Sequence, residues 1–492
     1  MEQKGIHVGR RDFIKTTTLA GMAVTLPATN LVSLDTRSAS KPSPQGTKRH
    51  LLFLTDAPKE YEKLLESIRS IKEYEFTVSP VQVNYQKPQE VAKVIQDKGA
   101  DILLVNPSRV TANSGDIPAA IGDPDIPVVL YPVNFDLIML EADIVATFRA
   151  RGINAMLANS PAHAVELIKI VAAPRILEGK KALIFGRPYD SSSIPARHLS
   201  ADYIYKRTGA RIQYRPIDEL KPLIAGVNEA SARKEMDRWK KEAVKVSEAS
   251  DQAILDASKL YVLLRSIVDK EGLSAISIDC LSFSFNANPI LPYPCLSFTR
   301  LRDEGIAAPC EADVCGGLSS MVLQEISQKP SYFCNVSAVD EQKSNAVLRH
   351  CVAPLKLMGR EAPQLTYNLR DYHGTGRGVT PEVDFPIGVE ITMGGFNKDL
   401  SRFVIWPGRT QARVRDTNRP SFENAPPAYQ KMRRYCSNDL EVNIKDVNRF
   451  LQSIAGCHHV MVAGSYTSAI RDAMMRMNVD VVGPSDLAAP QA

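Results

Sequence analysis

The sequence predicts an α/β protein in which parallel sheets covered by helices are followed by a β-rich unit. In the first two thirds of the chain, short apolar runs alternate with segments of helical spacing, which is typical of strands and crossover helices in parallel sheets. From residue 355 to residue 414 the helical spacing fades, and alternating segments appear between turns that contain glycine or proline. That change predicts a small barrel in the last third of the chain.

The α/β part contains two cycles of strands and helices. Strands are expected at residues 50–55, 101–105 and 126–131 in the first cycle, and at 181–186, 210–214 and 274–279 in the second. Helices are expected at residues 58–71, 88–98, 140–151, 161–171, 230–269 and 313–326, and the long region 230–269 should divide near residues 247–251. Gly186 ends an apolar strand without further glycines, so we interpret it as a turn rather than a phosphate-binding loop.

The β-rich part is expected to hold alternating strands, with helices near its end. Strands are expected at residues 382–393, 402–406, 411–415 and 458–462, and helices at 447–454 and 465–477. We therefore expect an N-terminal α/β domain at 46–176, a second α/β domain at 177–345 and a β-rich domain at 346–492.

Composition is typical of a soluble globular protein, with 44% hydrophobic and 23% charged residues among 492. The formal net charge of +5 is weak, and no basic run with interleaved aromatics occurs, which argues against nucleic acid as a partner. After the N-terminal segment, no stretch has the roughly 18 consecutive apolar residues of a membrane helix. A small molecule is the expected partner.

Residues 1–40 are expected to be a targeting segment and linker. Arg10-Arg11 precedes a mildly apolar stretch and then a segment rich in Ser, Pro and Lys, which resembles a twin-arginine export signal. The alternative is a disordered basic tail. The signal predicts a periplasmic or otherwise exported protein that folds, and takes up any metal, before export.

All eight cysteines lie between Cys280 and Cys457, in the second half of the chain. A chain of this size needs no disulfide framework, although an exported protein could form one or two disulfides. Their clustering near candidate site residues predicts packing around a site.

Glu311 is the leading candidate for chemistry. It lies where an apolar segment meets the start of a helix, and parallel sheets place ligands beyond the carboxyl ends of their strands. Asp313, two residues later, is interpreted as the N-cap of that helix. Glu311 is interpreted as a metal ligand or an acid/base residue.

Histidines add to this candidate site. His350 follows a strand-like run, and His458-His459 begins another. A lone histidine is more often a core residue, but two such positions favour metal ligation. In an extended segment His458 and His459 point to opposite faces, so only one should enter the site. His373, at a turn, is a candidate substrate contact or a surface residue.

These residues carry a family resemblance. Tyr293-Pro-Cys295, Cys310-Glu-Ala-Asp313, Phe333-Cys-Asn335 and His350-Cys351 are similar to the signature of the L-fucose isomerase/L-arabinose isomerase superfamily. The resemblance covers residues 274–354, and His458-His459 resembles the C-terminal histidine site of those enzymes. It implies two Rossmann-like domains before a barrel, a trimer or hexamer, and a divalent ion, usually Mn²⁺, that serves aldose–ketose isomerisation of a sugar.

Carried over residue by residue, the resemblance implies a metal site and one departure from it. Glu311 would be ligand and acid/base residue, His350 and one of His458/His459 would be ligands, and Cys310 would lie against the substrate. Asn335 stands where the family has Asp or Glu as second ligand and base. An amide oxygen can bind a metal but cannot accept the proton that isomerisation moves.

Three hypotheses therefore remain open. The first is a metal-dependent aldose–ketose isomerase. In the isomerase, Asp340 could replace the base that Asn335 cannot provide. The second is a carbohydrate-binding protein on the same scaffold that lacks turnover, favoured by Asn335 and by export. The third is a thiolate metal site that uses cysteines from the set Cys310, Cys334, Cys351 and Cys457 beside the histidines.

Overall fold

The computed structural model describes residues 48–72, 74–107, 115–124, 126–173, 175–284, 289–413 and 436–485. The expected export signal in residues 1–40 lies outside the described residues, as do the last two residues of the expected strand 411–415. No helix in the described ranges combines the length and the apolar composition needed to cross a bilayer.

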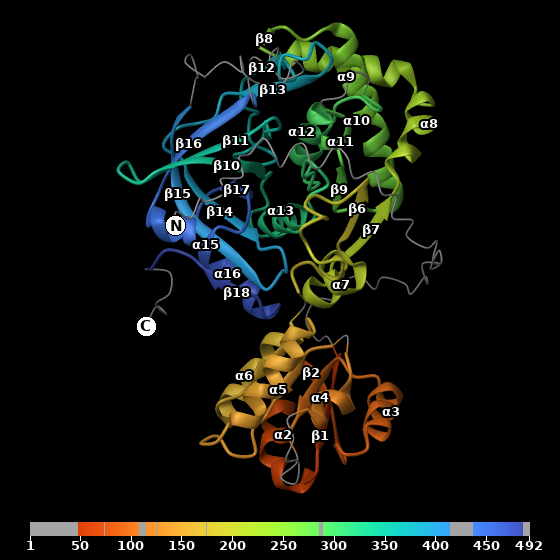
Figure 1. The fold of residues 1–492 in the computed structure, drawn as a ribbon, viewed down its shortest axis with the longest axis vertical. Coiled ribbons are helices and arrows are strands. Elements are labelled where there is room, and N and C mark those ends of the chain that lie inside the picture. The colour runs from red at the N-terminus through yellow and green to blue at the C-terminus, as the bar shows by residue number, and fades with distance from the viewer. Residues whose placement is uncertain are drawn as a thin grey trace, which may run out of the picture. The chain divides into compact units, whose positions relative to one another are not determined.

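The first α/β domain is built on a parallel sheet with the strand order β2–β1–β3–β4–β5 (Figure 1). Its strands are β1 (Lys48–Thr55), β2 (Glu75–Gln82), β3 (Ile102–Val105), β4 (Val128–Leu130) and β5 (Ala155–Leu157). Leu52 and Leu54 of β1 enter one hydrophobic core, and Leu51 and Phe53 enter another. Both faces of the sheet are therefore covered, which explains the continuous apolar run of β1.

Helices follow the strands of this domain, and all except α4 (Asp116–Ile121) correspond to expected helices. They are α2 (Glu62–Arg69), α3 (Pro88–Lys98), α4 (Asp116–Ile121), α5 (Met139–Ala150) and α6 (Pro161–Ala172). The expected helix 58–71 is shorter, because a 3-10 turn at Pro58–Tyr61 precedes α2. The sequence patterns did not predict β2, an edge strand whose residues are only partly buried and include Pro80.

The second α/β domain has a three-stranded parallel sheet with the order β7–β6–β9. Its elements are β6 (Lys181–Phe185), α7 (Ala201–Thr208), β7 (Arg211–Arg215), α8 (Leu220–Ala225), α9 (Glu229–Glu242), α10 (Asp251–Glu271), β9 (Ala275–Ile278), α11 (Leu281–Ser284), α12 (Cys295–Asp303) and α13 (Val314–Ser327). The expected helical region 230–269 is two helices, because β8 (Lys245–Val246) interrupts it and Ser250 caps α10.

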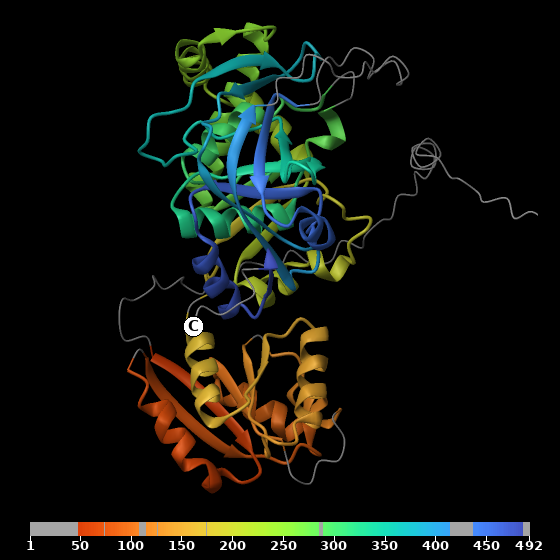
Figure 2. The same cartoon turned by 90° about the vertical axis from the view of Figure 1, so that its left-hand side faces the viewer.

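A closed six-stranded antiparallel barrel forms the C-terminal region, as expected (Figures 1 and 2). Around the barrel the strands run β14 (Glu390–Phe396), β17 (His458–Ala463), β10 (Tyr332–Asp340), β11 (Asn345–His350), β16 (Asn438–Ile444) and β15 (Arg402–Arg413). Pairing of β14 with β15 closes the ring, and β18 (Asp480–Val482) adds to β15 in parallel. Helices α15 (Val447–Ser453) and α16 (Thr467–Arg476) flank β17 in sequence.

The expected strand 382–393 is wrong as a single strand. Its first residues belong to β13 (Val379–Val383), which pairs with β12 (Tyr367–Asp371) in a separate sheet, and its last belong to β14 of the barrel. Pro386, which lacks an N–H, and Gly388, with φ of +78°, separate the two. The expected domain boundary at residues 345/346 falls within the hairpin of β10 and β11.

Candidate metal centre

Glu311 lies on a tight loop at the carboxyl end of the second parallel sheet. Residue Ala307 bridges in parallel to Ala275 of β9, so the chain leading to Glu311 runs along that sheet. Glu311 and Ala312 both have a positive φ, +66° and +56°. A left-handed backbone costs a non-glycine residue about 1 to 2 kcal/mol, and such strain is concentrated at functional sites.

Ser277 of β9 holds this loop in place. Its hydroxyl donates to the carbonyl of Pro309 at 2.6 Å and accepts from the amide of Ala312 at 3.1 Å. Because both bonds are buried, they fix the two ends of the loop against the sheet. The strained backbone therefore presents the Glu311 side chain at one defined place.

Two histidines from the barrel face Glu311. His350 ends β11, and its Nε2 is 3.7 Å from Glu311 Oε1; His458 begins β17, and its Nε2 is 3.4 Å from Glu311 Oε2. One ligand atom from each of the three residues can be chosen so that all lie within 4.8 Å of one another. We call Glu311, His350 and His458 the carboxylate–histidine cluster.

Burial shifts the pKa values of two members of the cluster, Glu311 and His350. Burial raises the pKa of the Glu311 carboxyl, and the nearby His458 offsets part of this rise. Burial lowers the pKa of His350 well below its ordinary value, and His458 adds to this effect. Both ring nitrogens of His350 are buried without a hydrogen-bond partner. A neutral imidazole with an unpartnered nitrogen beside a carboxylate is an arrangement that a metal ion would satisfy.

Asp313 orients His458. Nδ1 of His458 donates to Asp313 Oδ2 at 2.8 Å, and Asp313 Oδ1 accepts from the amide of Gly316, which confirms its expected role as the N-cap of α13. Burial alone would lower the pKa of His458, but the bonded Asp313 and the charge of Glu311 raise it well above its ordinary value. Carboxylates that hold ligand histidines in this way are a common feature of metal sites.

The remaining predicted site residues have different surroundings. Asn335 is partly buried and is the pairing partner of His458 between β10 and β17, so both side chains lie on one face of the barrel wall. His459 points to the other face, where its ring packs on Phe450, and burial lowers its pKa to about 4. Tertiary structure therefore brings His458, and not His459, to Glu311.

Cysteines surround the cluster rather than enter it. Cys310 contacts the guanidinium of Arg302 at 3.6 Å, and burial raises its pKa to about 12. Cys334 is buried beside the carbonyl of His459, while Cys457 is exposed beside the hydroxyl of Tyr189. All eight cysteines are free thiols. Of the proposed thiolate set Cys310, Cys334, Cys351 and Cys457, the first two and Cys457 lie in three different surroundings, and Cys351 lies beside His373.

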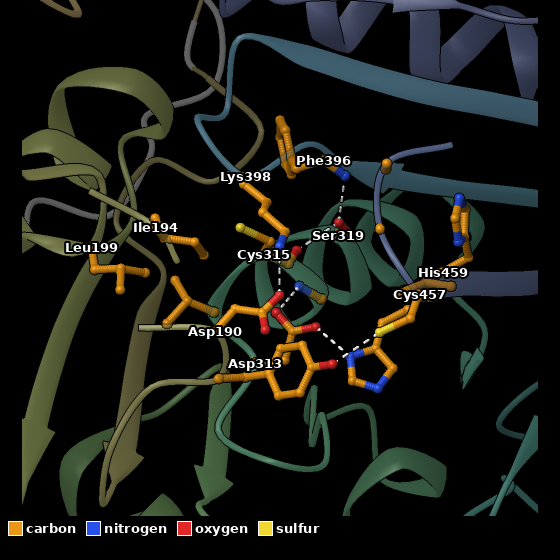
Figure 3. Close-up of a pocket in the computed structure, with 17 residues that line it drawn as sticks. Asp190, Ile194, Leu199, Asp313, Cys315, Ser319, Phe396, Lys398, Cys457 and His459 are labelled. Carbon is orange, nitrogen blue, oxygen red and sulfur yellow. Dashed lines mark hydrogen bonds and ion pairs between the residues drawn. The ribbon is translucent and has the colours of Figure 1, made fainter. Parts of the chain in front are cut away.

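A small pocket opens beside His458 and Asp313 (Figure 3). Tyr189, Lys398 and Cys457 contribute to its wall, and Lys398 pairs with Asp190 at 2.6 Å. The pocket is small and partly open to solvent. Sequence reasoning missed Tyr189, although it follows the turn at Gly186 after a buried strand.

Comparison with known proteins finds only partial similarity to sugar isomerases. No protein-family model matches the chain. Part of the chain is similar to proteins named sulfoquinovose isomerase: 23% identical over 120 residues in Priestia aryabhattai, 30% over 100 residues in Alkalicoccus urumqiensis and 30% over 95 residues in Clostridium sp. (strain MSTE9).

These alignments are short. They cover 24%, 20% and 19% of this chain and 26%, 22% and 20% of the respective relatives, so the chain matches about a quarter or less of each relative's length. The similarity supports a relationship to sugar isomerases, as the motifs around Glu311 predict. It does not point to L-fucose or L-arabinose isomerases in particular.

Proposed function

We propose that this protein is a metal-dependent aldose–ketose isomerase whose centre is the carboxylate–histidine cluster. The observation that carries the proposal is the convergence of Glu311 with His350 and His458 from separate strands of the barrel. Partial similarity to sulfoquinovose isomerases supports the same reaction class. Within that class, the substrate is a sugar with a carbonyl at C1 or C2.

The donor set fits a divalent cation. Glu311, His350 and His458 would hold it through one carboxylate and two imidazole nitrogens. We propose Mn²⁺ because the family resemblance implies it and because the oxygens of a bound sugar would add donors that suit this ion. A bound ion would polarise the carbonyl and hydroxyl oxygens of the sugar and so acidify the C–H bond between them.

The chain's own groups then account for the proton transfer. A carboxylate such as Glu311 that binds the ion through one oxygen would keep its other oxygen available as the base. Aldose–ketose isomerisation moves the proton on C2 to C1 on the same face of an enediol, so one carboxylate can perform both of these carbon transfers. The hydroxyl proton on O2 moves to O1 in the same reaction. Asp313 keeps His458 turned towards Glu311 throughout.

Asn335 supports a second candidate, a carbohydrate-binding protein without turnover. Its amide lies beside His458 on the cluster's face of the barrel wall, at the position where the resemblance implies a second acidic ligand and base. Asp340, the alternative base, lies at the other end of β10, where the pKa of its partly exposed carboxyl is lowered by the amide of Lys343. Its distant position and its lowered pKa both make Asp340 unsuitable as a base at the cluster.

One experiment separates the two candidates. We expect full-length protein loaded with Mn²⁺ to exchange the C2 hydrogen of an aldose with D₂O, in a panel containing L-fucose, L-arabinose and sulfoquinovose. Glu311→Gln should lose about 100-fold or more of this exchange. Sugar binding without exchange in the wild type, together with exchange gained in Asn335→Asp, would identify the binding protein instead.

Export and assembly are also proposed. We propose that the protein leaves the cytoplasm by the twin-arginine route and works as a homo-oligomer, a trimer or a hexamer. Cell fractionation of the wild type and of an Arg10→Lys/Arg11→Lys variant tests the first point, because replacement of both arginines should leave the protein in the cytoplasm. Light scattering of the purified protein measures the second.

A further inference from the structure

A second group of potential ligands lies beside the carboxylate–histidine cluster. The Sγ atom of Cys351 is 2.9 Å from Nε2 of His373 and 3.6 Å from Sγ of Cys436. Ligand atoms from all three lie within 4.8 Å of one another, and Cys351 is buried while Cys436 is partly so. We call Cys351, His373 and Cys436 the thiol cluster.

The three members come from separate parts of the β-rich region. Cys351 directly follows β11, His373 lies in the turn between β12 and β13, and Cys436 comes just before β16. Two of these segments are joined by Asn438, whose Nδ2 donates to the carbonyl of Cys351 at 3.1 Å and to that of Pro381 at 2.9 Å. The scaffold therefore holds the thiols near the turn that carries His373.

The turn itself is strained and well braced. His373 has a φ of +52°, which is uncommon for a residue with a side chain. The carboxylate of Asp371 accepts from the amide of Gly376 at 2.7 Å, and the amide of Thr375 donates to the carbonyl of Tyr372 at 3.0 Å. These hydrogen bonds hold the His373 imidazole against Cys351. Backbone strain of this kind is concentrated at functional sites.

We propose that the thiol cluster is a separate metal site that binds a soft divalent cation, Zn²⁺, through Cys351, His373 and Cys436. A tetrahedral zinc with bonds of about 2.3 Å to sulfur places two sulfur ligands roughly 3.7 Å apart, close to the 3.6 Å between Cys351 and Cys436. A disulfide would need a separation of about 2.05 Å. The imidazole, 2.9 Å from Cys351, would withdraw by roughly 0.6 Å to join the two sulfurs, and a water molecule would take the fourth position.

The two clusters differ in ligand chemistry, although one peptide bond joins His350 to Cys351. Glu311 with two imidazoles offers oxygen and nitrogen, whereas the thiol cluster offers two sulfurs and one nitrogen. Thiolates select Zn²⁺ over Mn²⁺. A zinc bound there would tie the end of β11, which carries His350, to the β12–β13 turn and to the start of β16.

Cobalt substitution tests this site without reference to any enzymatic activity. Full-length protein, stripped of metal and kept reduced, is titrated with Co²⁺, because thiolate ligands give sulfur-to-cobalt charge-transfer absorption that oxygen and nitrogen ligands do not. We expect this band in the wild type, in Glu311→Gln and in the matched cysteine control Cys457→Ser. It should disappear in Cys351→Ser, and Zn²⁺ should displace Co²⁺ from the wild type.

Substitutions of single ligands test whether each of them contributes to zinc binding. Cys436→Ser and His373→Ala should weaken Zn²⁺ binding by about 100-fold or more in a chelator competition, with circular dichroism unchanged. No charge-transfer band in the folded wild type would overturn the proposal, as would a band in Cys436→Ser with the intensity and Co²⁺ affinity of the wild type. A Cys351–Cys436 disulfide that persists in the reduced preparation, seen by peptide mass spectrometry, would overturn it too. Failure of the isomerase proposal leaves these outcomes unaffected.

Discussion

Asp313 and His458 form a buried pair in which Nδ1 donates to the carboxylate at 2.8 Å and Nε2 is left facing Glu311 at 3.4 Å. The pair joins the start of α13 to the start of β17, two elements far apart in sequence. It fixes both the tautomer and the ring orientation of one proposed ligand. The first two predictions follow from this pair.

Asp313→Asn should weaken Mn²⁺ binding by about 10- to 100-fold, because an amide holds the His458 ring less firmly and leaves its nitrogen less basic. The side-chain oxygen of Asn can still accept from the amide of Gly316, so α13 should keep its cap. Isothermal titration calorimetry measures the affinity. Ser250→Ala, which removes the cap of α10, is the control: it should cost about 1 kcal/mol of stability and leave Mn²⁺ affinity unchanged.

Mn²⁺ affinity should rise with pH. Since the pKa of His458 is raised well above its ordinary value, the ion must displace a proton from this ring at neutral pH, whereas His350, whose pKa is lowered, is already neutral. Displacing one proton corresponds to about tenfold in affinity for each pH unit below the pKa of His458. Titrations between pH 6 and 9 check this slope. Asp313→Asn should flatten it, and an unchanged slope in that variant would contradict the assignment.

Gly316→Ala should destabilise the protein and disturb the cluster together. A Cβ at this position would collide with the ring of Phe333, which packs 4.5 Å from the ring of His458 between centroids. Overpacking of this kind costs about 1 to 3 kcal/mol. Chemical denaturation measures the loss. Gly226→Ala is the matched control, because its Cβ would meet only ordinary contact at 3.6 Å, and we expect no loss there.

Asp303→Asn should stabilise the protein at pH 8. Burial raises the pKa of Asp303 to about 7, so its stabilising contribution is present below pH about 4 and is lost as the pH rises through 7. The side-chain amide of Asn can still accept the hydrogen bond that Asp303 receives from the backbone N–H of Lys356 at 2.9 Å. We expect a gain of about 2 kcal/mol at pH 8 that vanishes near pH 4.

Denaturation curves at both pH values measure this gain. Asp269→Asn provides a comparison of opposite sign, because its hydrogen bond with Arg265 lowers the pKa of this exposed carboxyl. That substitution should not stabilise the protein at pH 8. A gain of equal size at both positions would refute the burial argument for Asp303.

Local patterns predicted the α/β class, the C-terminal barrel and many of the individual elements. Strand β1 is buried on both faces, which leaves a continuous apolar run. Helices α3 and α6 are buried on one face, which leaves apolar residues at helical spacing. The failures have physical causes as well. Edge strand β2 is only partly buried, so it carries no such period, and the segment 382–393 alternates across two different sheets.

The sequence by itself determined the kinds of groups available: a carboxylate at a strand–helix junction in Glu311, histidines beside strands, and cysteines near both. Strand alternation also required His458 and His459 to face opposite sides. Only the tertiary structure decided that His458 faces Glu311 and that Cys351 meets His373 and Cys436. The reason is that spacing along the chain sets which face a side chain occupies, whereas pairing between distant strands sets which faces meet.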